Sequence, residues 1–240
     1  MKLLIWGIKG KMGDLIRSTA EADPFWTSIE GVDTNNPVEA LTELPQVVID
    51  FSHPNALGQV LDYCTTHRLP LVMGTTGLNA EELARVEEAS KVIPILQATN
   101  MSLGMNLMFS LVEQVASRLK GTVDIEVLEA HHHRKKDAPS GSAVTIVESI
   151  EKGLGAPAKH QHGREGQCLR EKGEIGIHAL RGGNIVGLHE AHFINEMETL
   201  KITHEAHDRG VFAQGALAAA KYLIDQKPGR YHMRDVLGLS

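Results

Sequence analysis

The first hundred residues alternate short runs of β-branched and other apolar residues with longer segments of helical periodicity. This alternation predicts β-strands joined by helical crossovers, because the apolar period changes between two and about 3.6 residues. Strands connected in this way pair in parallel and carry binding sites at their carboxyl ends. The expected strands are Lys2–Ile8, Thr27–Val32, Gln46–Phe51, Pro70–Met73 and Val92–Gln97, and the expected helices are Lys11–Ala22, Pro54–His67 and Asn79–Lys91.

A glycine-rich turn separates the first expected strand from the first expected helix, with Gly7, Gly10 and Gly13 in the segment LLIWGIKGKMGDLIRS. Backbone amides and the positive end of the helix dipole can hold a pyrophosphate there. The GxxGxxG spacing is a variant of GxGxxG and is a weak signal alone. Asp33 strengthens it, because a carboxylate after the second strand can accept hydrogen bonds from an adenosine ribose. Together these features favour a dinucleotide site over a turn without a ligand.

Two further turns follow the fourth and fifth expected strands, GTTG at Gly74–Gly77 and ATNM at Ala98–Met101. Both fall at the carboxyl ends of strands, so we expect them to border a nicotinamide, although each alone also fits an ordinary loop turn. The candidate cofactor-binding residues are Gly7, Ile8, Lys9, Gly10, Lys11, Met12, Asp33, Gly74, Thr75, Thr76, Ala98, Thr99, Asn100 and Met101.

The charges near the glycine turn give conflicting indications about the nucleotide. Asp33 disfavours a 2′-phosphate and therefore favours NADH, whereas Lys9 and Lys11 can neutralise that phosphate. We therefore expect the chain to use either NADH or NADPH.

The pattern changes after Asn100. The expected elements are helices at Met105–Leu119 and Ala143–Gly153, a long loop at Gly155–Gly173, a last helix at Phe212–Ile224, and strands at Thr122–Ala130, Glu174–Leu180, Ile185–Ile194 and Glu198–Ala206. The sequence RGGN at 181–184 is a hairpin signal between two of these strands. We expect an α/β fold in which a Rossmann-type, doubly wound parallel sheet carries an inserted α+β domain with a mixed or antiparallel sheet. The expected dinucleotide-binding domain is 1–102 with 211–240, and the substrate-binding and oligomerisation domain is 103–210.

Composition limits the classes of function. The net charge of −6 provides no general field for nucleic acid, and no apolar run is long enough to span a membrane or to form a signal peptide. We therefore expect a cytoplasmic protein without nucleic-acid or membrane partners. Two distant cysteines, Cys64 and Cys168, indicate neither a disulfide framework nor a cysteine zinc site.

The segment EAHHHRKKDAPSG at 129–141 concentrates histidines and cations in an acidic chain. Metal binding by His131 and His133 is one interpretation, but the neighbouring cations oppose a dication, and we expect no metal. A solvated basic patch is another. A third is a pocket for a small dicarboxylate, with a histidine as proton donor, Lys135 as cation and the amides of the helix start as anion donors.

These residues resemble the 4-hydroxy-tetrahydrodipicolinate reductase (dihydrodipicolinate reductase) family along the whole chain. The glycine turn, GTTG, the signature E-x-H-H-x-x-K-x-D-x-P-S-G-T and the later segment HEAHDRGVFAQGA carry the resemblance. Three positions depart from the family pattern: Ser142 replaces threonine, Met101 replaces a common phenylalanine and Thr99 replaces a frequent proline. The last two concern the cofactor pocket and leave the catalytic segment unchanged.

The resemblance implies catalytic roles for His131, as proton donor, and Lys135. It implies substrate-binding roles for His132, Ser140, Gly141, Ser142 and Arg209. It also implies a homotetramer and the NAD(P)H-dependent reduction, with loss of water, of 4-hydroxy-tetrahydrodipicolinate in diaminopimelate and lysine biosynthesis. His133, Arg134 and Lys136 fall at variable positions of the signature, so we expect them to face solvent.

Two alternatives remain open. Another two-domain NAD(P)-dependent reductase would share the architecture but lack the signature around His131. A dinucleotide-sensing protein without turnover would carry a DNA-binding element, and none is visible in the sequence.

Overall fold

The computed structural model describes residues 1–34, 36–41 and 43–239, so residues 35, 42 and 240 of the expected nucleotide domain lie outside the described residues. The chain divides into two compact units. The first comprises Met1–Leu103 and Gly210–Ser240, and the second comprises Gly104–Arg209.

A six-stranded sheet forms the centre of the first unit, and every pair of neighbouring strands in it is parallel. The strands are β1 (Lys2–Trp6), β2 (Ser28–Val32), β3 (Val47–Asp50), β4 (Leu71–Met73), β5 (Pro94–Gln97) and β11 (Gly229–Tyr231). Their order is β11-β5-β4-β3-β1-β2, so the chain leaves β1 toward β2 on one side and later returns to β3 on the other. Such a change of direction leaves a crevice at the carboxyl ends of the strands, where doubly wound folds bind ligands.

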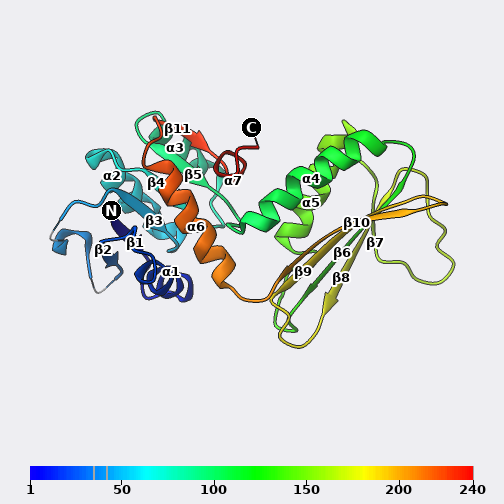
Figure 1. Ribbon diagram of the computed structural model, residues 1–240, viewed down its shortest axis with the longest axis horizontal. Helices are drawn as coiled ribbons and strands as arrows, with labels where there is room; N and C mark the ends of the chain where they lie inside the picture. The colour runs from blue at the N-terminus through cyan, green and yellow to red at the C-terminus, as the bar shows by residue number, and fades with distance from the viewer. Residues whose placement is uncertain (35, 42, 240) are drawn as a thin grey trace. The chain divides into compact units, whose positions relative to one another are not determined.

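Helices cover both faces of this sheet (Figure 1). Their bounds are α1 (Lys11–Glu21), α2 (Leu57–His67), α3 (Ala80–Ser90), α6 (Gly210–Leu223) and α7 (Met233–Val236), with short 3₁₀ turns η1 (Val38–Ala40) and η2 (Pro54–Ala56). Alternate residues of β1 point into two hydrophobic cores, one on each face of the sheet. Leu3 and Ile5 pack with α1 and α6, whereas Leu4 and Trp6 pack with α2 and α3. Burial on both faces explains why inner strands such as β1 and β4 are apolar almost throughout.

The second unit contains a mixed five-stranded sheet in the order β10-β9-β6-β8-β7. The strands are β6 (Asp124–His131), β7 (His160–His162), β8 (Ile175–Arg181), β9 (Gly187–Ile194) and β10 (Thr199–Ala206). Helices α4 (Leu103–Leu119) and α5 (Gly141–Leu154) pack on one face, where Val127 and Phe193 lie in the core between sheet and helices. With this sheet and the parallel sheet of the first unit, the predicted fold class is confirmed.

The predicted hairpin at 181–184 is wrong. Strand β6 lies between β8 and β9, parallel to β8 and antiparallel to β9. The turn between β8 and β9 instead bonds to the end of β6, because Gly182 donates to the carbonyl of His131 and His132 donates to that of Ile185. A local turn signal could not indicate that a distant strand would insert between its two arms. The turn therefore positions the residues that follow β6.

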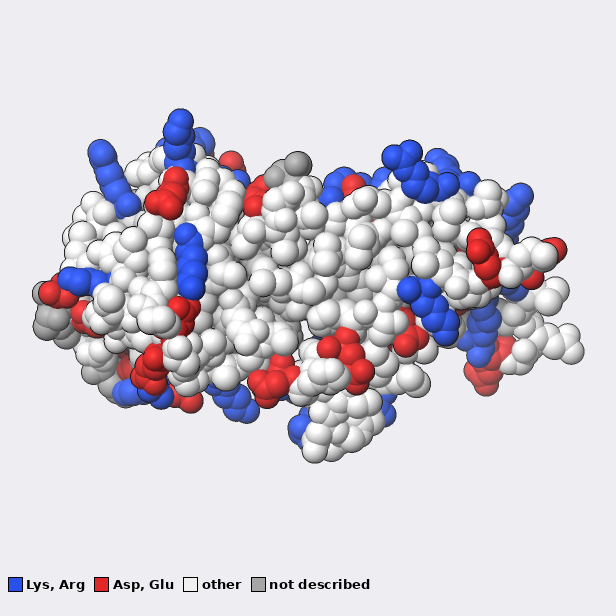
Figure 2. Space-filling model, viewed as in Figure 1, with Lys and Arg blue, Asp and Glu red and all other residues white. Residues whose placement is uncertain are grey.

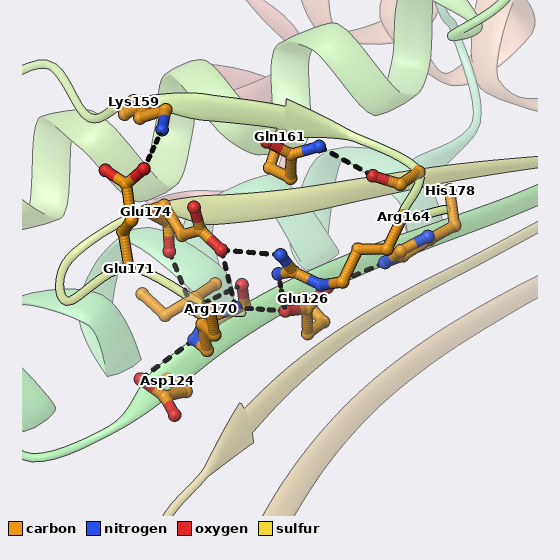
Figure 3. A network of polar contacts seen from close by, with 11 residues as sticks. Asp124, Glu126, Lys159, Gln161, Arg164, Arg170, Glu171, Glu174 and His178 are labelled. Atoms are coloured by element: carbon orange, nitrogen blue, oxygen red, sulfur yellow. Dashed lines mark hydrogen bonds and ion pairs between the residues drawn. The ribbon is translucent and has the colours of Figure 1, made fainter. Parts of the chain in front are cut away.

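The predicted long loop at Gly155–Gly173 contains one short strand, β7, and a segment held against the sheet by charge. Arg170 pairs with Glu126 of β6 and lies 2.9 Å from Asp124, while Arg164 lies 3.0 Å from Glu126 and 2.7 Å from Glu174 (Figure 3). His178 Nε2 lies 2.7 Å from the second oxygen of Glu126. The arginines thus fix residues 163–173 without a hydrophobic core of their own.

None of the helices in the described part of the chain combines the length and apolar character needed to cross a bilayer. On the face drawn in Figure 2, basic and acidic side chains both occur on each unit.

Candidate functional site

The glycine turn after β1 is closed by the backbone alone. Gly7 has φ +85°, and a β-carbon there would lie 2.8 Å from the carbonyl oxygen of Phe51. The amide of Gly10 donates to Gly7 O at 2.9 Å, and Gly10 precedes the first turn of α1. A β-carbon at Gly13 would lie 2.7 Å from Cα of Ile8, so α1 approaches the turn too closely for a side chain. This arrangement fits a pyrophosphate at the helix N-terminus.

Asp33 follows β2, and its Oδ2 lies 3.4 Å from Nζ of Lys9 in the glycine turn. Asp33 and Gly7 border a cavity of about 750 Å³ within the first unit, which is large enough for a nucleoside. Its lining includes Trp6, Gly7, Val32, Asp33, His53 and Tyr63. The predicted glycine turn and Asp33 thus come together around one cavity, and their geometry fits a dinucleotide.

Asp50, at the end of β3, was missed by the sequence analysis. It is buried, and its carboxylate accepts hydrogen bonds from the hydroxyls of Ser52 and Thr75, the latter at 2.7 Å. Burial raises the pKa of the Asp50 carboxyl, and the bonds from Ser52 and Thr75 oppose that rise. Its backbone oxygen also accepts from the amide of Gly74 at 2.8 Å. Asp50 therefore fixes the turn that carries Gly74, Thr75 and Thr76.

The turn at 98–101 continues directly from β5. Ala98 donates to Met73 O at 3.2 Å, and the Asn100 side chain accepts from the amide of Ser102 at 2.9 Å. Thr99 is exposed, whereas Met101 is buried in the core between the sheet and α6. The predicted residues of this turn therefore differ in exposure, and Met101 has a packing role.

His131 ends β6 with its ring held by a buried carboxylate. Nδ1 of His131 lies 2.6 Å from Oε2 of Glu129, two residues earlier on the same face of the strand. The Glu129 side chain is 0% exposed and also accepts two bonds from Arg181, each at 2.7 Å. Burial by itself raises the pKa of Glu129, but the hydrogen bonds from His131, Arg181 and the Ser140 amide lower it to about 2. Glu129 is therefore ionised near neutral pH.

The cations after β6 differ in exposure. Lys135 is partly buried, and its Nζ lies 2.9 Å from Oδ2 of Asp137. His133, Arg134 and Lys136 are exposed. Lys135 thus differs from Arg134 and Lys136 in being partly buried.

His132 and Arg209 interact electrostatically although they are far apart in the sequence. Burial lowers the pKa of His132, and the charges of Arg134 and Arg209 add to this effect. Within the described residues, Nδ1 of His132 is buried without a hydrogen-bond partner. The charge of Arg209 thus acts on His132, the other predicted substrate residue.

Ser140 caps α5 from a buried position. Its hydroxyl accepts from the amide of Ala143 at 3.2 Å and lies 3.1 Å from Nε2 of His189. Ser140 is 2% exposed, so its hydroxyl is occupied by the cap and His189, whereas Gly141 and Ser142 begin the helix at the surface. The first amides of a helix lack intrahelical partners and favour anions.

His189 is a further neighbour of His131 that the sequence analysis did not single out. Their ring centroids are 5.1 Å apart and the rings meet edge to face. Burial, followed by the nearby charge of His131, lowers the pKa of His189 to about 4. His189 therefore stays neutral at physiological pH.

Among the described residues, no group of three or more histidine, cysteine or carboxylate side chains is arranged to hold a metal ion.

A doubly wound parallel sheet with a glycine turn, a carboxylate after its second strand and a second unit presenting histidines and cations is typical of a two-domain, dinucleotide-dependent oxidoreductase. The particular family follows from comparison with known proteins. The chain belongs to the dihydrodipicolinate reductase family: the family model of the N-terminal part matches residues 1–101 and that of the C-terminal part matches 104–237. The resemblance seen in the sequence is thereby confirmed, and the family is dependent on pyridine nucleotides.

Relatives match along the whole chain. The chain is 67% identical to the 4-hydroxy-tetrahydrodipicolinate reductase of Alkaliphilus metalliredigens over 100% of both proteins. It is 63% identical to that of Alkaliphilus oremlandii, over 100% of this chain and 99% of the other. A dipicolinate-bound dihydrodipicolinate reductase from Paenisporosarcina sp. TG-14 shares the fold, with a TM-score of 0.76 at 20% identity over 97% of each chain.

Proposed function

We propose that this chain reduces 4-hydroxy-tetrahydrodipicolinate to tetrahydrodipicolinate, with loss of water, as a step in diaminopimelate and lysine biosynthesis. The observation that carries the proposal is the segment from Glu129 to Ser142 in a chain of this family. It contains a histidine hydrogen-bonded to a buried carboxylate, a lysine paired with an aspartate, and the N-terminus of α5. The second unit then binds the substrate, and the first unit binds the nucleotide.

The nucleotide is held by the glycine turn and the cavity beside it. The amides at the start of α1 would hold its pyrophosphate, and Asp33 would accept hydrogen bonds from the adenosine ribose. The turns at 74–76 and 98–101 would hold the nicotinamide end. When bound, the nucleotide supplies the hydride.

The dicarboxylate is held by charge and by backbone amides. Lys135 and Arg209 each supply a cation, His132 adds a ring nitrogen, and Gly141 and Ser142 offer the amides of the α5 N-terminus. Charge-assisted bonds of this kind contribute about 1.5–3 kcal/mol each before desolvation. Ser140 acts mainly as the cap that fixes this helix start. A dianionic substrate explains why an acidic protein gathers cations here.

His131 delivers the proton. After hydride addition the ring retains an enamine, which must accept a proton at carbon. The Glu129 carboxylate can only accept, so Nδ1 of His131 carries a hydrogen and Nε2 is the nitrogen that exchanges the catalytic proton. Lys135 lies on the same segment and serves as a second donor.

We propose that the chain uses both NADH and NADPH. Asp33 serves the ribose hydroxyls of NADH, while Lys9 and Lys11 can neutralise the 2′-phosphate of NADPH. The ion pair between Lys9 and Asp33 supports this proposal, because each charge partly neutralises the other and neither then excludes one of the two nucleotides.

A homotetramer formed through the sheet of the second unit is also proposed. Exposed apolar side chains such as Leu180, at 53%, support an interface there. Light scattering that gives the mass of a single chain would overturn it.

A cytoplasmic location is proposed as well, because the reaction consumes reduced nucleotide that the cytoplasm supplies.

A coupled assay tests the function. The substrate is generated from pyruvate and aspartate semialdehyde by its synthase, and the absorbance of NADH and of NADPH is followed separately. We expect loss of reduced nucleotide that depends on both the synthase and this chain. A chain that binds the nucleotide but consumes neither form would instead be a dinucleotide sensor, and one that acts on other carbonyl or imine substrates would be a different reductase.

A further inference from the structure

Glu129 occupies a special position on β6. Its side chain is fully buried on the same face of the strand as His131, and its two oxygens receive four hydrogen bonds. Oε2 accepts hydrogen bonds from Nδ1 of His131 at 2.6 Å and from Nη1 of Arg181 at 2.7 Å. Oε1 accepts hydrogen bonds from Nη2 of Arg181 at 2.7 Å and from the Ser140 amide at 3.0 Å. A buried carboxylate is stable as an anion when hydrogen-bond donors surround both of its oxygens.

Arg181 balances the charge of Glu129 and ties it to the loop that carries Lys135. It ends β8 directly opposite His131 in the sheet. Besides its two bonds to Glu129, it donates to the carbonyl of Asp137 at 2.7 Å. Asp137 in turn pairs with Lys135 at 2.9 Å. The proposed acid and the proposed substrate cation therefore depend on the same ion pair.

The ring of His131 has one tautomer compatible with these contacts. An ionised carboxylate has no proton to donate, so the hydrogen of the 2.6 Å contact belongs to Nδ1 of His131. Nε2 is then the nitrogen that gains and loses a proton. A β-carbon at Gly187 would lie 3.3 Å from Nε2, so a glycine there leaves space beside this atom.

The Ser140 amide extends the same arrangement to the anion site. Ser140 is the residue before α5, and its backbone N–H is fixed by Glu129 while its hydroxyl caps the helix. Moving Glu129 would therefore disturb the start of α5, where Gly141 and Ser142 are proposed to bind a carboxylate.

We propose that Glu129, held by Arg181, is a positioning residue that fixes the Nδ1–H tautomer of His131 and the N-terminus of α5 together, so that proton donor and carboxylate-binding amides keep one geometry. This proposal rests on the proposed reductase function. Glu129 does not touch the substrate and acts through His131 and Ser140.

The test is Glu129→Gln, compared with Glu126→Gln. Glu126 lies on the opposite face of the same strand and also joins a histidine and arginines, through His178 at 2.7 Å and Arg164 and Arg170 (Figure 3). The two variants therefore remove the same charge from similar networks, and only one of them contacts His131. Melting temperatures show how much each variant loses in stability.

In Glu129→Gln, we expect kcat to fall about 10- to 100-fold with the KM of the nucleotide unchanged, since general acid catalysis contributes at least about that much. Glu126→Gln should keep kcat within about twofold of wild type. Arg181→Lys, which keeps the charge but cannot make two parallel bonds, should give an intermediate kcat and serves as second variant if Glu129→Gln does not fold. Equal kcat in wild type and in whichever variant folds would overturn the proposal.

A second readout does not need turnover. Nitrogen NMR of histidine-labelled protein reports which ring nitrogen carries the hydrogen, and His131→Asn identifies the signal among 13 histidines. We expect Nδ1–H in wild type. In Glu129→Gln the amide oxygen should stay with Arg181 and Ser140, so the NH₂ group faces Nδ1 and the hydrogen moves to Nε2. Arg181→Lys should populate both tautomers.

The NMR result separates the two claims. Inactive wild-type protein with the Nδ1–H tautomer would defeat the reductase function alone. Active wild-type protein with Nε2–H would defeat the positioning role alone.

Discussion

Oδ2 of Asp33 lies 3.4 Å from Nζ of Lys9, so the carboxylate proposed to bind the ribose of NADH and a cation proposed to neutralise the 2′-phosphate of NADPH are paired with each other. Asp33 is mostly buried, whereas the Lys9 side chain is 65% exposed and can turn toward a phosphate. This geometry supports the proposal that one site accepts both nucleotides.

Substitutions at this pair should separate the two nucleotides. Asp33→Ala should raise the KM of NADH about tenfold, because hydrogen bonds from ribose to a charged acceptor are lost. Lys9→Ala should raise the KM of NADPH by a factor of about 2–5 and leave that of NADH nearly unchanged, as expected for an exposed ion pair. Steady-state kinetics with both nucleotides measure this. Equal changes for NADH and NADPH in both variants would contradict the assignment.

His131→Gln should lower kcat by about 100-fold or more, because the proposed proton donor is removed. The affinity for the nucleotide should change little, since the substitution lies in the other unit. Turnover and nucleotide binding are measured on the same preparation. A fully active variant would assign the proton to another group.

Lys135→Met should reduce kcat/KM for the dicarboxylate about 10- to 100-fold, because a charge-assisted bond worth about 1.5–3 kcal/mol disappears. Lys136→Met is the matched control, since it removes the same charge from the next, exposed residue. The control should behave like wild type. Similar losses in both variants would indicate a general effect of charge instead of a held ligand.

His189 should make the stability of the second unit dependent on pH. Burial lowers its pKa to about 4 from 6.5, so between these values the unfolded chain binds more protons than the folded one. The stabilisation is fully present above pH 6.5 and is lost as the pH falls toward 4, on the order of 3 kcal/mol. His189→Asn should flatten the dependence of the free energy of unfolding on pH between 6.5 and 5. Exposed His207→Asn is the control, and an unchanged slope in His189→Asn would refute the assignment.

Gly13→Ala should weaken nucleotide binding at least about tenfold and lower the melting temperature, because its β-carbon would lie 2.7 Å from Cα of Ile8 and push α1 away from the turn. Gly182→Ala serves as control, since a β-carbon there meets nothing within 4 Å. Calorimetric titration with NADH measures the binding. Wild-type affinity in Gly13→Ala would show that α1 need not approach so closely.

The sequence predicted the first unit well because β1, β3 and β4 are each followed by a helix of that unit, and strand and helix are both local patterns. The capping box of α3, in which Asn79 and Glu82 bond reciprocally, could be seen in the letters alone. Three-residue strands such as β7 and β11 were missed, because Gly229–Tyr231 has no apolar run to mark it.

Long-range relationships set the limit of prediction for the site. The alternation of β6 already places Glu129 on the face of His131, so its role was within reach of the sequence. Arg181 was not, because its position opposite His131 requires β6 to insert between β8 and β9. Asp50 was missed for a similar reason, since its partner Thr75 follows a different strand.

The most direct test of the central claim is a crystal structure of this chain with dipicolinate bound. We predict a carboxylate at the start of α5, within about 3 Å of Nζ of Lys135 and of the Gly141 or Ser142 amides, with His131 Nε2 within about 4 Å of the ring. Dipicolinate bound elsewhere, with the His131 ring and Lys135 about 10 Å or more from it, would contradict the account, because neither group could then act on the substrate.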